Sequence, residues 1–512
     1  MRLAFRTDAS LQIGTGHVMR CLTLARHMRN AGAECRFISR DLPGHLGARI
    51  TAEGFALTLL PPPAGPPPTA PPAHAPWAGV HWAQDADETH KALSAQPADW
   101  LVMDHYAFGA DWQRRARPKA TQLLVIDDLA DRPHACDVLL DQNLGRNAAD
   151  YDGLIPAGTT CLIGPAYALL RPEFAALRKP ALAGRAGRGL HEVLITMGGV
   201  DAADATSVVL RALRGATLPQ GLTITVVMGA TAPALAQVQT LAASMPCPTQ
   251  VVVDVPDMAA RMAKADLAIG AAGSTTWERC CLGLPSIIVQ IADNQAGIAQ
   301  AITAAGAALN PGPLNAAGFA QNLRSALACA EQGLITLSQN AAAICDGDGA
   351  ARVARGLMPL KVRKARPEDA TAIWHWRNDG DASRYFLNTN PVPLEDHLDW
   401  FARALTDANR LLLVVQNGPD ALGHIRFDRA ESVSNHAEIS ICMNPEFRGA
   451  GFGTPSLHAT MDFARDTGFS SFSAQAHADN PASIRVFLKA GFHLVGRSGD
   501  FVQLSTTPKN WE

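Results

Sequence analysis

Three features are scarce or missing in this sequence of 512 residues: an excess of one charge, closely paired cysteines and long apolar runs. Lys and Arg total 44 against 47 Asp and Glu, and no basic stripe follows the chain, so we expect no nucleic acid partner. The 10 cysteines show neither the CxxC pairs of a zinc site nor the density of a disulfide scaffold, which predicts reduced thiols and no bound metal. No apolar run reaches the roughly 20 residues needed to span a bilayer, and the chain opens on a strand-like segment without a signal-peptide core. These absences predict a cytoplasmic protein without a membrane partner.

The length predicts several domains, because one hydrophobic core stops growing well below 512 residues. With 47% hydrophobic and 18% charged residues, the composition is that of a packed globular enzyme. We expect two Rossmann-like α/β domains, over residues 1–160 and 161–350, and a third domain over residues 361–512. The small and glycine-rich residues 345–355 are the expected junction, and no pattern favours a particular oligomeric state.

The first domain opens with the pattern strand, glycine loop, helix, strand. After a strand over residues 3–8 and a loop over residues 13–17, apolar residues recur on one helical face, namely Val18, Cys21, Leu22, Ala25 and Met28. A strand over residues 34–39 follows, and this order implies a parallel sheet with a right-handed crossover. Residues 61–76 are rich in Pro and Ala and are expected to form an inserted, exposed loop.

Further strands are expected at 100–103 and 123–126, and a second set at 193–196, 222–227, 250–253 and 267–269. Ligands of parallel sheets lie at the carboxyl ends of the strands, and nucleotide sugars commonly bind between two such halves. Beyond residue 360, closely spaced strands at 411–415, 423–427 and 438–443 indicate an antiparallel sheet instead.

The loop Gly14-Thr15-Gly16-His17 precedes the first helix. Glycines allow close approach of a phosphate or sugar to the backbone, and a helix start favours an anion. An imidazole in this position can take a proton from water. The other interpretation is that His17 only caps or packs against the helix.

Four ordered motifs resemble the UDP-sugar hydrolases of pseudaminic acid biosynthesis. They are RTDASLQIGTGHVMRCLTLA (6–25), VIDDLADRPHACDVLLDQN (125–143), GPAYALLRPEF (164–174) and TMGGVDAADAT (196–206). The resemblance covers about the first 350 residues and implies a GT-B arrangement of the two Rossmann-like domains. It also implies removal of UDP from UDP-2,4-diacetamido-2,4,6-trideoxy-β-L-altropyranose, with inversion and without a metal, by water that His17 activates.

The resemblance and the strand ends together give the candidate substrate residues of this half. Gly14, Gly16 and Gly199 lie in its glycine loops, and Asp104, His105 and Tyr106 follow a strand and are expected to face the sugar. Asp8 either orients His17, holds a sugar group or braces the loop. Asp127 and Asp128 are expected to be structural, because adjacent strand residues point to opposite faces.

The string GAAGSTTWE (270–278) resembles the UDP-binding loop of the bacterial N-acetylglucosaminyltransferases that make the cell-wall lipid precursor. A loop of small residues at a helix start can receive a diphosphate, and a Glu in the first turn can accept hydrogen bonds from ribose hydroxyls. We therefore expect Gly273, Ser274, Thr275 and Glu278 to contact UDP. Asn294 and Gln295 either hold the sugar or cap the following helix.

The third domain contains EISI (438–441), PEFRGAGFG (445–453), NPAS (480–483) and KAGF (489–492). These elements resemble the acetyl-CoA-binding core of the α+β GNAT N-acetyltransferases over residues 361–505. The resemblance implies acetyl-CoA as co-substrate, bound by Arg448, Gly449, Gly451, Gly453, Asn480 and Ser483. Upstream, WRN (376–378) and HLDWF (397–401) resemble the branch that acetylates the amino sugar of the pseudaminic pathway.

Acetyl transfer needs a base to deprotonate the amine. Glu438 is the candidate, and its alternative is a carboxylate paired within the sheet. Family members often carry a Tyr that protonates the thiolate, but Phe487 occupies that position here. This departure leaves the source of the proton open.

Together the two resemblances predict one bifunctional enzyme of pseudaminic acid biosynthesis that acts on UDP-linked amino sugars. The pathway resemblance implies flagellin glycosylation, and capsule and lipopolysaccharide are the alternative destinations. One alternative is a glycosyltransferase that moves its sugar to an acceptor other than water, since the fold is shared. In the other, the GNAT-like part is a sugar-binding or scaffold module without catalysis.

Overall fold

The computed structural model describes residues 1–119, 121–430 and 435–506, and they divide into two compact units, Met1–Ala354 and Arg355–Glu512. Helix α12 (Gly349–Leu357) contains this boundary. The first unit holds two parallel sheets and the second unit holds one largely antiparallel sheet.

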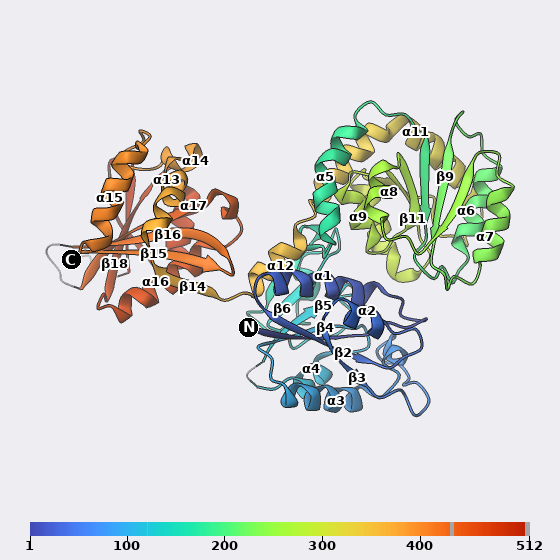
Figure 1. Ribbon diagram of the computed structural model, residues 1–512, viewed down its shortest axis with the longest axis horizontal. Coiled ribbons are helices and arrows are strands. Elements are labelled where there is room, and N and C mark those ends of the chain that lie inside the picture. The colour runs from blue at the N-terminus through green and yellow to red at the C-terminus, as the bar shows by residue number, and fades with distance from the viewer. Residues whose placement is uncertain (120, 431–434, 507–512) are drawn as a thin grey trace. The chain divides into compact units, whose positions relative to one another are not determined.

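The first sheet has seven parallel strands in the order β3-β2-β1-β4-β5-β6-β7. Helices α1 and α2 lie on one face, and α3 and α4 lie on the other (Figure 1). The elements are β1 (Arg2–Thr7), α1 (Gly16–Asn30), β2 (Glu34–Arg40), α2 (Gly47–Ala52), β3 (Ala56–Leu60), α3 (Trp82–Ala95), β4 (Trp100–Asp104), α4 (Ala110–Ala116), β5 (Gln122–Ile126), β6 (Val138–Asp141) and β7 (Thr160–Ile163).

Burial on both faces makes the central strands nearly continuous apolar runs, as in β4, where all five residues are buried. The reversal of strand order between β1 and β4 brings the loops after these strands to one edge of the sheet. The loop that carries His17 and the residues after Asp104 are therefore neighbours.

The second sheet is also parallel, in the order β10-β9-β8-β11-β12-β13. Its two faces are covered by separate apolar clusters, one centred on α6, α7 and α11 and the other on α5, α8 and α9. The elements are α5 (Pro172–Arg185), β8 (Glu192–Thr196), α6 (Ala205–Arg214), β9 (Thr223–Met228), α7 (Leu235–Ala243), β10 (Thr249–Val253), α8 (Met258–Lys264), β11 (Leu267–Ala271), α9 (Thr275–Cys281), β12 (Ser286–Val289), α10 (Ala296–Ala304), β13 (Ala308–Leu309) and α11 (Phe319–Ile344).

The second unit has the strand order β14-β15-β16-β17-β18-β20-β19. Helices α13 and α15 pack on one face and α16 on the other (Figure 1). The elements are β14 (Leu360–Lys364), α13 (Ala370–Asn378), α14 (Gly380–Ser383), α15 (Leu394–Thr406), β15 (Arg410–Asn417), β16 (Asp420–Arg429), β17 (His436–Met443), α16 (Gly453–Asp466), β18 (Ser471–His477), α17 (Pro481–Lys489), β19 (His493–Ser498) and β20 (Phe501–Ser505).

One feature of this sheet differs from the antiparallel expectation. Strands β17 and β18 are parallel, and their pairing runs only from His436↔Ser471 to Ile439↔Ala474. Beyond Ile439, strand β17 continues to pair with β16 but no longer with β18. The carboxyl ends of the two strands therefore separate, and this opening precedes the glycine-rich loop at residues 448–453.

Candidate functional site

A cavity of about 310 Å³ lies between the two sheets of the first unit. Its walls are the segments that follow the parallel strands, which is where α/β sheets bind ligands. From the first half it is lined by Thr15, Gly16, Met19, Arg20, Thr23 and Gln142, and from the second half chiefly by Thr196, Gly198, Gly199, Met228, Gly229, Asp254, Ser274, Thr275, Trp277 and Glu278. The connection between the halves adds Leu169, Leu170 and Arg171.

His17 lies in the first turn of α1, beside this cavity wall, and is bound to a buried carboxylate. Its Nδ1 is 2.6 Å from Asp104 Oδ1, and its side chain is 10% exposed. A contact this short requires a proton between the two atoms, which assigns the hydrogen to Nδ1. Nε2 then keeps its lone pair and can accept a proton.

Arg20, one turn further along α1, holds Asp104 from the other side. Its Nε and second terminal nitrogen donate to the two oxygens of Asp104 at 2.6 and 2.7 Å. Burial alone would raise the pKa of Asp104, but Arg20 and then His17 together bring it well below its usual range. Asp104 therefore stays ionised, and Arg20 lines the cavity as a cation.

Asp128 and Tyr106 complete the group around Arg20. Asp128 Oδ2 accepts hydrogen bonds of 2.6 Å from both Arg20 and the Tyr106 hydroxyl. The Tyr106 ring meets the His17 ring edge to face, with centroids 4.6 Å apart. Arg20 and Asp128 were not expected at this site from the sequence, although an Arg three residues after His17 lies on the same helical face.

Asp8 and His105 lie behind this group, each at most 1% exposed. Asp8 accepts hydrogen bonds from Arg6 at 2.6 Å and from the backbone N–H of Arg40 at 2.7 Å. His105 Nε2 is 3.3 Å from the other Asp8 oxygen. The sequence left three roles open for Asp8. This environment agrees with the third role, a carboxylate that braces the loop.

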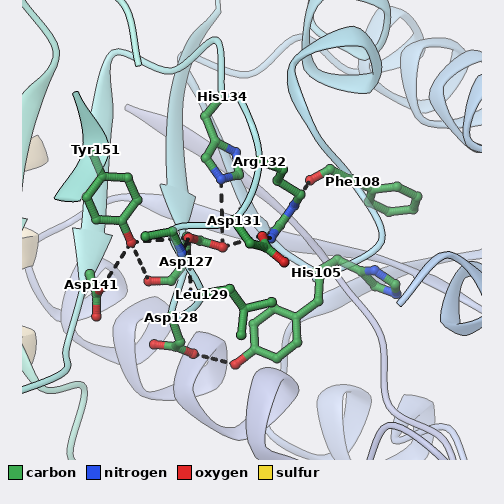
Figure 2. A network of polar contacts seen from close by, with 12 residues as sticks. His105, Phe108, Asp127, Asp128, Leu129, Asp131, Arg132, His134, Asp141 and Tyr151 are labelled. Carbon is green, nitrogen blue, oxygen red and sulfur yellow. Dashed lines mark hydrogen bonds and ion pairs between the residues drawn. The ribbon is translucent and has the colours of Figure 1, made fainter. Parts of the chain in front are cut away.

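Asp127 faces away from Asp128, as Figure 2 shows. It lies among Arg132 at 3.0 Å, His134 at 3.7 Å and the Tyr151 hydroxyl at 3.1 Å. The same hydroxyl is 2.9 Å from Asp141, so one hydrogen is shared between two carboxyl groups. Burial, and then the charge of Asp128, raise the pKa of Asp141 to about 7. Near neutral pH the Asp141 carboxyl group is therefore protonated part of the time.

The proline-rich segment over residues 61–76 was expected to be an inserted, exposed loop, and the structure agrees for residues 61–74, most of which are exposed. Residues 61–74 form no helix or strand, but Ala75–Ala78 form a 3₁₀ turn. His74 and Trp77 at its end pack against Tyr106, with centroids 5.3 and 5.6 Å from the Tyr106 ring. Nothing in the sequence pattern linked these residues to His17.

On the second half, Ser274, Thr275 and Glu278 line the cavity together with Gly199. Glu278 is 3.4 Å from Arg171, and burial raises its pKa although Arg171 opposes this. Gly16 is also a lining residue, whereas Gly14 and Gly273 stand next to lining residues and have open space around them. Gly14 takes a left-handed conformation at φ +79°, which only glycine adopts easily.

Asn294 and Gln295 are not among the residues that line this cavity. Asn294 is exposed, and Gln295 accepts a hydrogen bond of 3.1 Å from the backbone N–H of Ile291. Gln295 therefore braces its own loop in this structure; it stands at the N-cap position of α10, but its side chain makes no capping hydrogen bond.

In the second unit, Gly449 and Gly451 adopt left-handed conformations, at φ +76° and +86°, with open space around both. A Cβ on Gly453 would lie 2.9 Å from Val486, so this glycine lets α16 pack closely on α17. A turn of this kind at the start of the 14-residue helix α16 can present N–H groups to a pyrophosphate.

The remaining candidates of this unit make contacts within the protein. Arg448 pairs with Asp379 and donates to the Met443 carbonyl. Asn480 caps α17 by accepting from the Ser483 N–H at 3.1 Å, and Glu438 is exposed with Gln475 donating to it at 3.2 Å. The side chains of Arg448 and Asn480 thus bond within the protein.

Phe487 is 1% exposed and packs in the apolar core against Phe492. Near the separated end of β18, the ring of Tyr385 lies 5.8 Å from that of His477. His477 Nδ1 accepts the Asp479 N–H at 3.2 Å. No sequence motif pointed to the Tyr385 hydroxyl, because Tyr385 lies more than one hundred residues before Phe487.

Among the residues that the structure describes, no group of three or more His, Cys, Asp or Glu side chains is arranged to hold a metal ion. Within the same residues, no helix combines the length and apolarity that crossing a bilayer requires.

Two protein families match separate parts of the chain. Residues 192–311 match the glycosyltransferase family 28 C-terminal domain, and residues 360–493 match the acetyltransferase (GNAT) domain. The crystal structure of MurG from Acinetobacter baumannii superposes with a TM-score of 0.52 at 16% identity, over 69% of this chain and 97% of that chain. The expected fold class is thereby confirmed: a GT-B-like pair of Rossmann-like sheets followed by a GNAT domain.

Among curated proteins, the chain is 26% identical over 201 residues to the UDP-2,4-diacetamido-2,4,6-trideoxy-β-L-altropyranose hydrolase of Campylobacter jejuni. This match covers 39% of the chain and 61% of the hydrolase. An uncharacterised protein of Methanocaldococcus jannaschii is 20% identical over 98% of this chain and 99% of its own length. The chain joins a segment similar to a UDP-sugar hydrolase with a C-terminal GNAT domain, as the sequence motifs predicted.

Proposed function

We propose that the first unit hydrolyses UDP-2,4-diacetamido-2,4,6-trideoxy-β-L-altropyranose to UDP and free sugar, and that the second unit acetylates the UDP-4-amino sugar from which this substrate is made. The observation that supports the hydrolase most directly is the His17–Asp104 pair beside the cavity, at 2.6 Å. The similarity to the Campylobacter jejuni hydrolase supports the choice of sugar. The two reactions would be consecutive steps of pseudaminic acid biosynthesis in the cytoplasm, serving flagellin glycosylation.

In this mechanism His17 acts as the general base. Asp104 accepts the Nδ1 hydrogen, so Nε2 is free to accept a proton from water. The water oxygen attacks the anomeric carbon on the face opposite UDP, the bond from that carbon to the diphosphate oxygen breaks, and UDP leaves as an anion. Attack from the opposite face inverts the anomeric configuration. Ionised Asp104 stabilises the imidazolium that forms, and Arg20 keeps Asp104 ionised.

UDP would bind against the second half. Ser274 and Thr275 at the start of α9 and the glycines after β8 offer donors and close backbone approach to the diphosphate. Glu278 would accept hydrogen bonds from the ribose hydroxyls. Arg20 and Arg171, which line the cavity, would donate hydrogen bonds to the departing diphosphate, and no metal is part of this proposal.

In the second unit, acetyl-CoA would place its pyrophosphate at the loop over residues 448–453 and its pantetheine arm between the separated ends of β17 and β18. Glu438, exposed on β17, would take the proton from the sugar amine. The amine nitrogen then attacks the thioester carbon, the carbon–sulfur bond breaks and the thiolate leaves. Tyr385 is a candidate for returning a proton to the sulfur, since Phe487 has no hydroxyl.

The test is to incubate the protein with the UDP-4-amino sugar and acetyl-CoA, without any acceptor, and to follow the products by NMR. We expect consumption of acetyl-CoA, then free diacetamido sugar and UDP in equal amounts. Acetylation without release of free sugar would rule out the hydrolase proposal. Release of free sugar and UDP without acetylation would rule out the transferase proposal.

A glycosyltransferase is the second candidate, because the match of residues 192–311 is to a glycosyltransferase family. It predicts intact UDP-sugar in the acceptor-free incubation and turnover only after an acceptor is added. The same experiment therefore separates the two functions.

A further inference from the structure

The proline-rich segment supplies two aromatic side chains to the surroundings of His17. His74 and Trp77 lie 4.6 Å apart between ring centroids, and the Trp77 ring stacks on Tyr106 at 5.6 Å with an interplanar angle of 25°. The Trp77 ring also meets His17 edge to face at 6.2 Å. Together His74, Trp77 and Tyr106 form an aromatic wall around the proposed general base.

The backbone holds this wall in place. Gly79, at φ +70°, has no side chain, and a Cβ there would lie 2.5 Å from Pro63 Cγ. The start of the segment therefore packs directly on the backbone at its end. Prolines also limit the conformations of the unfolded segment, which lowers the entropy lost when it orders. The packing of Pro63 on Gly79 thus holds the Trp77 ring in place, although residues 61–74 form no helix or strand.

Part of this wall is available to a ligand. Trp77 is half-buried, so some of its ring remains accessible, and His74 Nδ1 is buried without a hydrogen-bond partner among the described residues. An apolar ring with a polar atom beside it matches a sugar that carries both apolar and polar groups. Buried polar atoms usually find a partner, and a bound ligand would provide one for His74.

We propose that Trp77 is a specificity-determining residue of the first unit: its ring forms the wall of the sugar subsite beside His17 and favours sugars with a deoxy carbon or acyl methyl groups on that face. A sugar hydroxyl on the same face would lose its hydrogen bonds to water, and the face of an indole ring would not replace them. The inference rests on the proposed hydrolase function, because it assumes that the sugar of a UDP-sugar lies at His17.

The experiment measures dissociation constants by calorimetry for UDP and for the UDP-diacetamido-trideoxy sugar, using the full chain. Four proteins are compared in a His17→Asn background, which keeps the UDP-sugar intact during the titration: the background itself, which serves as wild type here, Trp77→Ala, Trp77→Phe and the control Pro67→Ala. Pro67 lies in the same segment but is exposed. We expect Trp77→Ala to weaken binding of the UDP-sugar about 10-fold, the scale of one aromatic contact, with UDP binding unchanged. Trp77→Phe should keep most of the affinity, and Pro67→Ala should match wild type.

Unchanged UDP-sugar affinity in Trp77→Ala would overturn the inference. Equal weakening for UDP and UDP-sugar in both Trp77 variants would also overturn it, because Trp77 would then support the fold or the nucleotide site. Hydrolysis itself is scored separately, in the protein that retains His17: if that protein binds the UDP-sugar but releases no free sugar, the hydrolase proposal fails while the comparison of affinities still decides the role of Trp77.

Discussion

At the scale of single residues, the proposed chemistry depends on charges that support one another. His17 can act as a base only while Asp104 remains an acceptor for its Nδ1 hydrogen, and Asp104 remains ionised in a fully buried place only because Arg20 binds both of its oxygens. Asp128 in turn balances Arg20. Removing Arg20 would leave the buried carboxylate of Asp104 without its charged partner.

His17→Asn should lower turnover of the hydrolase by roughly 10² to 10⁴, the usual contribution of a general base, while UDP-sugar affinity changes little. Asn keeps a polar group of similar size but accepts no proton at neutral pH. The matched control is His81→Asn, since His81 is exposed, caps α3, and can be replaced in that role by Asn. Normal steady-state turnover in His17→Asn would show that another group activates the water.

Glu278→Ala should weaken UDP-sugar binding by about 1 to 3 kcal/mol, the scale of a hydrogen bond that involves a charged group, and should leave acetyl transfer unaffected. Calorimetric titration with UDP measures the change. Glu173→Ala is the control, because Glu173 also pairs with Arg171, at 3.2 Å, but does not line the cavity. If both variants bind UDP as wild type does, Glu278 is not a ribose ligand.

The second unit should lose stability in acid through His424. Burial, and then Arg426 and His397, lower the pKa of His424 from 6.5 to about 3, although Asp369 opposes this. The unfolded chain therefore takes up a proton near pH 6.5 while the folded unit does not. Stability from this group is complete above pH 6.5 and falls by up to about 1.4 kcal/mol per pH unit as the pH drops toward 3.

His424→Leu should flatten this dependence, because it removes the buried titrating group. Calorimetry of the full chain between pH 7 and 4, following the transition of the second unit, measures the effect. A variant whose transition temperature falls with acid as steeply as that of wild type would assign the dependence to other groups.

At the scale of elements, loops after neighbouring parallel strands meet closely at the cavity. Gly229, after β9, donates its N–H to the Gly199 carbonyl at 3.0 Å, and a Cβ on Gly229 would lie 2.3 Å from that oxygen. Both residues line the cavity. The shape of the UDP wall therefore depends on a backbone contact that admits no side chain.

Gly229→Ala should push these two loops apart and lower UDP affinity at least 10-fold, since real Cβ atoms do not approach a carbonyl oxygen this closely. Gly184→Ala, in α5 with open space around it, is the control and should be neutral or slightly stabilising. Titration with UDP and thermal unfolding of both variants check this. Wild-type affinity in Gly229→Ala would mean that the loops adjust without cost to the site.

At the scale of the whole molecule, the boundary Ala354–Arg355 separates two units that each bury their own core. A fragment from residue 355 onward should fold and bind coenzyme A, because the strands, the glycine-rich loop and α17 all lie within it. The complementary fragment should hydrolyse the UDP-sugar unaided. Calorimetric titration of the second fragment with coenzyme A tests this, and a folded fragment without affinity would remove the acetyl-CoA assignment.

The sequence by itself predicted the elements that local pattern determines. The apolar runs of β1, β4 and β8 and the helical face of α1 appear within two residues of the predicted positions, since burial on both faces or on one stripe leaves a periodic signature. The glycine loops and the ordered motifs also placed His17, Ser274 and Glu278 beside one cavity.

Only the tertiary structure decided which distant residues surround His17. Asp104 ends β4 and Asp128 follows β5, strands whose order in the sheet is not the order of the sequence, and Trp77 lies in a 3₁₀ turn that follows a loop without periodicity. It also decided that Asp8 and Gln295 bond within the protein, and that Tyr385 lies near the end of β18. The physical reason is that such contacts follow from strand order and loop closure over tens of residues, which leave no repeating mark in the local sequence.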